Sequence, residues 1–271
     1  MGTTENPIHA NQRTERERRP NQWSNAARLF RSEALLFLRE PQVLVFVLGF
    51  PVLTALVLGG VFGTEPDDAF EFVKPSHFYT VAYFGVVLSA IGLLMLPVRV
   101  ASYREQGVLR RYDTAGFARW VFPAVQYLCG VTFALLGFGA LIAASQLSAG
   151  TPAIEDWGRT LVGIVAGTLA FISIGVALGM LYPSARAASG VGLTMFFPMF
   201  LLAGGGPPPE SLTDTMRAIA NWLPLTHVIR ATQEPWLGLG DGSNHLVVAF
   251  AMFVVATGLW LWRARHVSRA A

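Results

Sequence analysis

The segment "FYTVAYFGVVLSAIGLLMLPV", Phe78 to Val98, runs without a single charged side chain. A helix of about 20 apolar residues is long enough to cross the hydrocarbon core of a bilayer. The chain around it has 271 residues, of which 53% are hydrophobic and 14% charged. Soluble domains have about 25% charged residues. We therefore interpret the segment as a membrane-spanning helix and the chain as an integral membrane protein.

Five further uncharged blocks have a similar length. Together with the first they predict an all-α membrane protein whose six transmembrane helices lie within a domain at residues 41–265. The expected spans are Val43–Gly63, Phe78–Val98, Trp120–Leu147, Leu161–Tyr182, Ala187–Ala203 and Leu246–Trp262.

The basic residues fall mostly on one side of these spans. Sixteen of the 20 lie before the first span, in the second and fourth connections, or after the last span. The first connection instead holds Glu65, Asp67, Asp68 and Glu71. The positive-inside rule then places both termini in the cytosol. We expect a disordered cytosolic tail at 1–22 and a short one at 266–271, and we attribute the net charge of +3 to topology and not to nucleic-acid binding.

Several kinds of chemistry are disfavoured by what the spans lack. The expected spans contain no Asp, Glu, Lys or Arg, which argues against an ion-coupled pump built on carboxylates and against a hydrolase with charged catalytic residues. His77, His227 and His245 lie near span ends in no metal-binding or catalytic motif, and we interpret them as interfacial or packing residues. The chain has one lysine, Lys74, followed by a proline, so it has no P-loop. We expect no enzymatic activity, metal or cofactor on this chain.

The segment "WSNAARLFRSEALLFLRE", Trp23 to Glu40, predicts an interfacial amphipathic helix at residues 23–40 that ends at Pro41. Polar residues at Asn25, Arg28, Arg31, Ser32 and Arg39 share one face. The opposite face is expected to contain Trp23, Ala26, Ala27, Phe30, Ala34, Phe37 and Leu38. A simple membrane anchor and a mechanical element both fit this pattern.

The connection "VRVASYREQGVLRRYDTAGFARW", Val98 to Trp120, is too polar to span and too long for a tight turn. Tyr103 to Tyr112 could form a short helix that includes Gly107. A solvated, positively charged loop is the alternative.

The segment "LLAGGGPPPESLTDTMRAIANWLPLTHVIRATQ", Leu201 to Gln233, ends the fifth span abruptly, because glycine and proline both disfavour helix. Ser211 is the expected N-cap of the next helix, with Asp214 three residues later. An apolar stripe follows at Leu212, Met216, Ile219 and Leu223. Such a helix can re-enter the membrane from outside, or it can lie in an ordinary surface loop.

At these residues the chain resembles the permease subunits of ABC-2-type exporters of the daunorubicin-resistance kind. The resemblance rests on the amphipathic helix followed by "FPVLTALVLGGVFG", on "YREQGVLRRYDTAG" between spans two and three, on the six-span plan, and on the Gly/Pro-rich segment with Pro-Leu-Thr. Where the family often has Thr-Pro and Tyr, this chain has Ala115-Gly116 and His227.

The resemblance implies one subunit of an ATP-driven exporter in the bacterial plasma membrane. Two permease chains, as a homodimer or heterodimer, would work with two copies of an ATP-binding cassette subunit, which would hold ATP and Mg. The residues implied in coupling to the ATPase are Arg28, Arg31, Arg39, Tyr103, Arg104, Glu105, Gly107, Arg110 and Arg111. The residues implied in a re-entrant exit gate, formed by extracellular helices between spans five and six, are Gly204, Gly205, Pro207, Leu212, Met216, Ile219, Pro224, Leu225 and Thr226.

The uncharged, aromatic-rich spans favour a hydrophobic or amphipathic cargo, such as a drug, natural product or lipid. An exporter of polysaccharide or glycolipid is the alternative within the same fold. A membrane-embedded enzyme or an assembly factor is the alternative from another class.

The orientation is tested by cysteine labelling in intact cells. We expect a membrane-impermeant maleimide to label cysteines placed at Asp67, Asp156 and Asp241. Cysteines placed at Gln22, Gln106 and Arg269 should be protected until the membrane is permeabilised. Labelling of position 106 from outside would invert the assignment.

Overall fold

The computed structural model describes residues 22–41, 44–62, 65–114 and 121–267. Nearly all of the predicted tails at 1–22 and 266–271 lies outside these ranges. The described residues form helices and no strands; an isolated bridge between Asp67 and Val73 closes a turn.

Within the described ranges six helices are long and apolar enough to cross a membrane, which agrees with the predicted number. The first span joins a π-helical turn, η1, to α4, and the second joins α5, the π-helical turn η3 and α6. The bounds are η1 Leu44–Gly49, α4 Phe50–Val61, α5 Pro75–Ala90, η3 Ile91–Met95, α6 Leu96–Glu105, α8 Val121–Ser148, α9 Trp157–Leu181, α10 Ala185–Leu202 and α13 Ser243–Val267.

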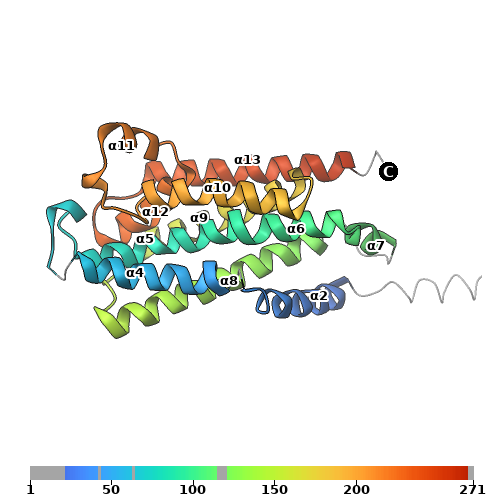
Figure 1. Ribbon diagram of the computed structural model, residues 1–271, viewed down its shortest axis with the longest axis horizontal. Coiled ribbons are helices and arrows are strands. Elements are labelled where there is room, and N and C mark those ends of the chain that lie inside the picture. The colour runs from blue at the N-terminus through green and yellow to red at the C-terminus, as the bar shows by residue number, and fades with distance from the viewer. Residues whose placement is uncertain (1–21, 42–43, 63–64, 115–120, 268–271) are drawn as a thin grey trace, which may run out of the picture.

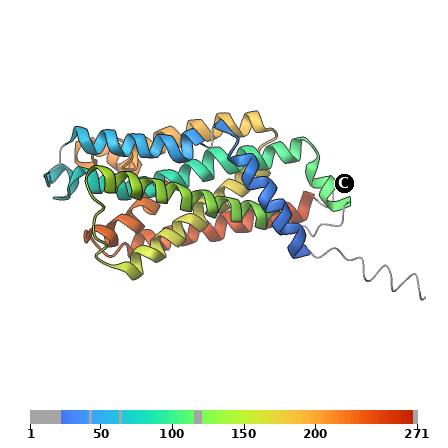
Figure 2. The ribbon, with the colours of Figure 1, turned by 90° about the horizontal axis from the view of Figure 1, so that it is seen from below.

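Short helices lie at both ends of this bundle. The α2 end contains α2 (Gln22–Phe37), α7 (Val108–Thr114) and the end of α13 (Figure 1). The α11 end contains α11 (Asp214–Ala220), α12 (Pro224–Leu237) and the turns η2 (Asp68–Phe70) and η4 (Pro209–Ser211). Figure 2 shows α2 running obliquely to the long helices. The described chain begins and ends at the same end of the bundle, as an even number of spans requires.

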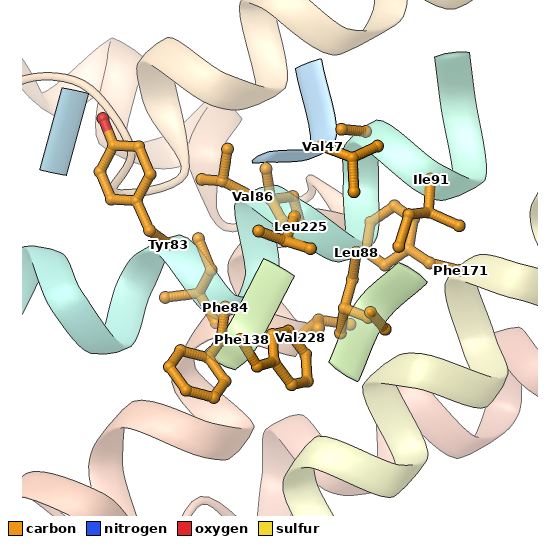
Figure 3. Close-up of a cluster of buried hydrophobic side chains, with 14 of the residues drawn as sticks. Val47, Tyr83, Phe84, Val86, Leu88, Ile91, Phe138, Phe171, Leu225 and Val228 are labelled. Atoms are coloured by element: carbon orange, nitrogen blue, oxygen red, sulfur yellow. The ribbon is translucent and has the colours of Figure 1, made fainter. Parts of the chain in front are cut away.

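The second span lies in the middle of the bundle. Within its most apolar window 89% is buried by protein, against 17% for the first span and 11% for the sixth. Ile91 from this span lies beside Phe171 of α9, Leu88 lies near Val228 of α12, and Val86 lies beside Leu225 of α12 (Figure 3). The second span therefore faces mainly other helices, whereas the first and sixth leave most of their apolar surface for lipid or another chain.

Close helix packing around the second span depends on glycine. A Cβ atom added to Gly192 of α10 would lie 2.2 Å from the carbonyl oxygen of Leu93, and one added to Gly175 of α9 would lie 2.8 Å from that of Gly92. Small residues allow such backbone approach in membranes, where water provides no drive for helices to associate. The glycines fix how near α9 and α10 lie to the second span.

The turn after α10 is fixed by two buried hydroxyl groups of α5. Tyr83 donates to the carbonyl oxygen of Gly205 at 2.7 Å, and Tyr79 donates to that of Gly206 at 2.9 Å. The next helix begins later than predicted, because Ser211 closes the turn η4 through its bonds to the Pro208 carbonyl. Thr213, not Ser211, is the N-cap of α11.

Packing at Gly192 is tested against Gly190 on the same helix, where an added Cβ would meet nothing within 4 Å. Gly192→Ala should lower the free energy of unfolding by about 1–3 kcal/mol, because the methyl group overlaps the Leu93 carbonyl. Gly190→Ala should be neutral or slightly stabilising. Thermal unfolding of the purified chain in detergent measures both, and equal midpoints would disprove the close approach.

Candidate functional site: an ion-pair cluster between α2 and α6

The helix α2 has the two faces predicted for it. Ala26, Phe30 and Phe37 face the core and Ala34 is half-buried, whereas Arg28, Arg31 and Arg39 are exposed. Ala27 and Leu38, predicted on the apolar stripe, are instead exposed, and the side chain of Trp23 lies outside the description. The buried face also includes a carboxylate, Glu33, of which only 2% is exposed.

Glu33 forms an ion-pair cluster with Glu40, Arg99 and Tyr103. The Nε and Nη2 atoms of Arg99 both lie 3.2 Å from Oε2 of Glu33, and the Tyr103 hydroxyl donates to Oε1 at 2.6 Å. Nη1 of Arg99 forms an ion pair with Glu40. Each of these bonds joins the α2 segment to α6, the last part of the second span.

Aromatic rings complete the surroundings of Arg99. Its guanidinium carbon lies 4.9 Å from the ring centroid of Phe37 and 4.9 Å from that of Tyr103. A guanidinium over an aromatic face is attracted by the ring quadrupole, more strongly where water is excluded. The cluster therefore holds Arg99 by charge, hydrogen bonds and aromatic contacts together.

The second carboxylate is in a different environment from the first. Burial raises the pKa of Glu40, an effect that the neighbouring Arg99 opposes and Glu33 reinforces. Two carboxylates near one guanidinium compete for the same positive charge. The pairing of Glu40 with Arg99 therefore weakens as pH falls through the raised pKa of Glu40.

Arg104 and Glu105, predicted to couple to the ATPase, contact other helices of the same chain. Nη1 of Arg104 donates to the carbonyl oxygens of Gly179 and Tyr182 at the end of α9, both at 3.1 Å. A Glu105 carboxylate oxygen accepts from the amide of Ala185, at the start of α10, at 3.0 Å. These charges complement the two helix ends, where unpaired carbonyls and amides lie.

The predicted helix from Tyr103 to Tyr112 is two helices. The α6 helix ends at Glu105 and α7 begins at Val108, because Gly107 between them has φ +68°, a conformation that favours glycine. Arg111 on α7 is exposed, and the side chain of Arg110 lies outside the description.

Sequence reasoning found Tyr103 but missed Glu33, Glu40 and Arg99. One signal was present: Glu33 follows Phe30 by three residues and precedes Phe37 by four, so it interrupts the apolar stripe of α2. An unexplained charge on a buried face needs a partner. The sequence alone did not indicate which of the arginines that partner would be.

The predicted gate residues lie at the α11 end and divide into three groups. Leu225 and Thr226 are buried in the bundle, as are the glycines of the turn. Met216, Ile219 and Pro207 are exposed, and Leu212 and Pro224 are half-buried. The structure thus brings α12 into the core but leaves the apolar stripe of α11 at the surface. Within the described residues no three His, Cys, Asp or Glu side chains could hold a metal ion.

Comparison with known proteins adds two findings. Residues 26–235 match the model of a family described as "ABC-2 type transporter". The chain is also 26% identical over 199 residues to a Bacillus subtilis (strain 168) protein named "Putative transport permease YvfS", a match that covers 70% of this chain and 76% of that protein.

The energetic role of the cluster is tested at Arg99. Arg99→Met leaves Glu33 buried without its cation, and the free energy of unfolding should fall by about 3–5 kcal/mol. The control is Arg159→Met, whose ion pair with Asp156 is 61% and 43% exposed and should be worth about 0–1 kcal/mol. Thermal unfolding in detergent compares them. Adding Glu33→Leu to Arg99→Met should restore most of the lost stability, and equal effects of the two single substitutions would refute the assignment.

Proposed function

Because the chain belongs to the ABC-2 type transporter family, we propose that this transport permease is the membrane subunit of an ATP-driven exporter and receives the force of ATP hydrolysis at its α2 end. The ion-pair cluster is the observation on which this proposal rests. It joins α2, a helix oblique to the bundle, to the second span, which contacts most of the other long helices.

The distribution of arginines supports a cytosolic location for the α2 end. Exposed Arg28, Arg31 and Arg39 on the α2 segment and Arg111 on α7 would then face the cytosol, where an ATP-binding subunit approaches. A movement of α2 would reach Arg99 through Glu33, and a movement of α6 would reach α9 and α10 through Arg104 and Glu105. The coupling role proposed for Arg104 and Glu105 is thus one of transmission within the chain.

The partners we propose are two ATP-binding cassette subunits, which would bind ATP and Mg, and a second permease chain, identical or related. The chain has no P-loop of its own. Its first, fifth and sixth spans leave most of their surface uncovered by protein, which leaves apolar area for a second permease as well as for lipid.

A hydrophobic or amphipathic cargo fits a groove next to the ion-pair cluster. Phe46, Leu94, Met95 and Leu193 contribute apolar surface to the groove, and Glu40 and Ser189 are its polar residues. The groove lies between the first, second and fifth spans. A cargo with an apolar body and one polar or cationic group would match this lining.

We propose that α11 and α12 form the re-entrant pair at the outer end of the pathway. The backbone of α12 lies close to α9, where a Cβ added to Gly163 would lie 2.2 Å from the Ala231 carbonyl oxygen. Leu225, Val228 and Ile229 are buried against α5 and α9. A helix that enters the membrane only part of the way needs such protein contacts, because the backbone at its ends must be shielded from lipid.

Coupling is tested with Tyr103→Phe in the complex with the ATP-binding subunit. The substitution removes the hydrogen bond to Glu33 but keeps the ring over Arg99, so assembly should be normal while transport falls severalfold. Hydrogen bonds to charged groups are worth about 1.5–3 kcal/mol. Tyr182→Phe, at the same end of the bundle, is the control.

Transport in vesicles and ATPase activity of the purified complex are measured side by side. Normal transport by a normally assembled Tyr103→Phe complex would contradict the coupling role of the cluster. ATP hydrolysis by the highly purified permease alone would contradict the division of labour between subunits.

A further inference from the structure

Two histidines meet at the α11 end, away from the ion-pair cluster. His227 belongs to α12 and His245 to the first turn of α13, and their ring centroids lie 5.1 Å apart. The two Nδ1 atoms lie 2.9 Å from each other. We call these residues the histidine pair. Eighteen residues separate them in the sequence, so only the packing of α12 on α13 brings them together.

The outer nitrogen of each ring also has a partner. Nε2 of His227 lies 3.0 Å from the carbonyl oxygen of Asn221, and Nε2 of His245 lies 3.4 Å from a carboxylate oxygen of Glu234. The same oxygen of Glu234 lies 3.5 Å from Arg230, whose other nitrogen lies 3.3 Å from Glu71 in the loop after α4. The contacts form one chain from α13 through α12 to that loop.

Counting protons shows which state of the histidine pair satisfies all three contacts. The Asn221 carbonyl and the Glu234 carboxylate are acceptors, so each Nε2 must be protonated. The Nδ1–Nδ1 contact needs one further proton, with one ring as donor and the other as acceptor. Three protons on four nitrogens correspond to one positive charge for the two rings together.

Adding or removing a proton breaks a contact. With two protons both rings are neutral, and one of the three hydrogen bonds has no donor. With four protons both Nδ1 atoms are donors and two cations face each other at 2.9 Å. We infer that the histidine pair binds one shared proton and that this proton joins α12 to α13, so that the contact opens when the pair either gains a second charge or loses its only one.

The electrostatic surroundings agree with a single charge. A hydrogen bond from His245, with help from Arg230 and against the effect of burial, lowers the pKa of Glu234, which keeps it a carboxylate facing the pair. Burial and the charge of His245 lower the pKa of His227, which opposes uptake of a second proton. Stability from the shared proton is therefore lost as pH rises through the upper titration step. It is also lost as pH falls through the lower step.

Other charged groups on the elements around the pair have partners of their own. On α9 and the segment before it, Arg159 pairs with Asp156. On α11, Arg217 pairs with Glu210. Asp241, before α13, accepts from the backbone and side chain of Ser243. The remaining titratable groups at this end on the described elements packed nearby are His77 and Lys74 at the start of α5, Asp214 at the start of α11, and Glu155 before α9.

The test is a titration of the full-length chain, ¹⁵N-labelled at histidine, in lipid nanodiscs with EDTA. NMR of the ring nitrogens follows protonation from about pH 4.5 to 9.5, and His227→Gln and His245→Gln assign the signals. We expect the pair to titrate in two steps separated by more than about one pH unit, as coupled sites do. Independent titration of both rings near the usual value of about 6.5 would overturn the inference.

A second variant separates a shared proton from simple packing. Glu234→Gln keeps the size of the side chain but removes the charge, so the upper step should move to lower pH while His77 stays unchanged. An unmoved upper step would refute the role of Glu234.

Thermal midpoints measured over the same pH range provide a readout that does not depend on transport. The difference between wild type and His245→Gln should be largest between the two steps, whereas that for His77→Gln, a single site, should show no such maximum. If the difference in thermal midpoint between wild type and His245→Gln does not vary with pH, the two rings are in contact but do not share a titrating proton, and the inference is wrong. These outcomes concern the chain itself and stand apart from the proposed function.

Discussion

The burial of the second span is the constraint on which the rest of the structure depends. A helix surrounded by other helices in a membrane gains little from hydrophobicity, because lipid is as apolar as its neighbours. Backbone proximity must therefore supply the contact, and the glycines at 175 and 192 provide it on α9 and α10. The same burial explains why charges at the end of this span, Arg99 above all, need partners from the protein.

Four side chains near the end of the second span attach it to three different elements. Arg99 and Tyr103 contact Glu33 on α2, Arg104 contacts the end of α9, and Glu105 contacts the start of α10. Because they lie within two helical turns, these contacts must move together or break. A buried ion pair adds little net stability when intact but costs much when one partner is removed. The buried ion pair of Arg99 and Glu33 is therefore better suited to fixing the geometry between α2 and the second span than to adding stability.

The membrane-spanning helices could be predicted from the sequence, whereas the contacts between charged side chains that are far apart in the sequence could not. The lengths of the uncharged segments were enough to locate six spans, because a helix needs about 20 apolar residues to cross the hydrocarbon core, whichever helices it packs against. The second span was predicted to end at Val98, since Arg99 interrupts the apolar run, yet the helix continues because Glu33 neutralises that charge. The two residues are 66 positions apart, and only the placement of α2 on the bundle brings them together. Gly107 was misread for a related reason: its positive φ becomes visible only in the folded turn.

The second span makes contacts at both ends of the bundle, and its helix is not regular along its whole length. The second span binds α2 through Arg99 at one end and the turn after α10 through Tyr79 and Tyr83 at the other. Between them lies the π-helical turn η3, followed by Pro97, which has no amide proton to give to the Leu93 carbonyl. That carbonyl lies against the backbone of α10 at Gly192. The backbone hydrogen-bond ladder of the second span is therefore interrupted at the point where the span packs closely on α10.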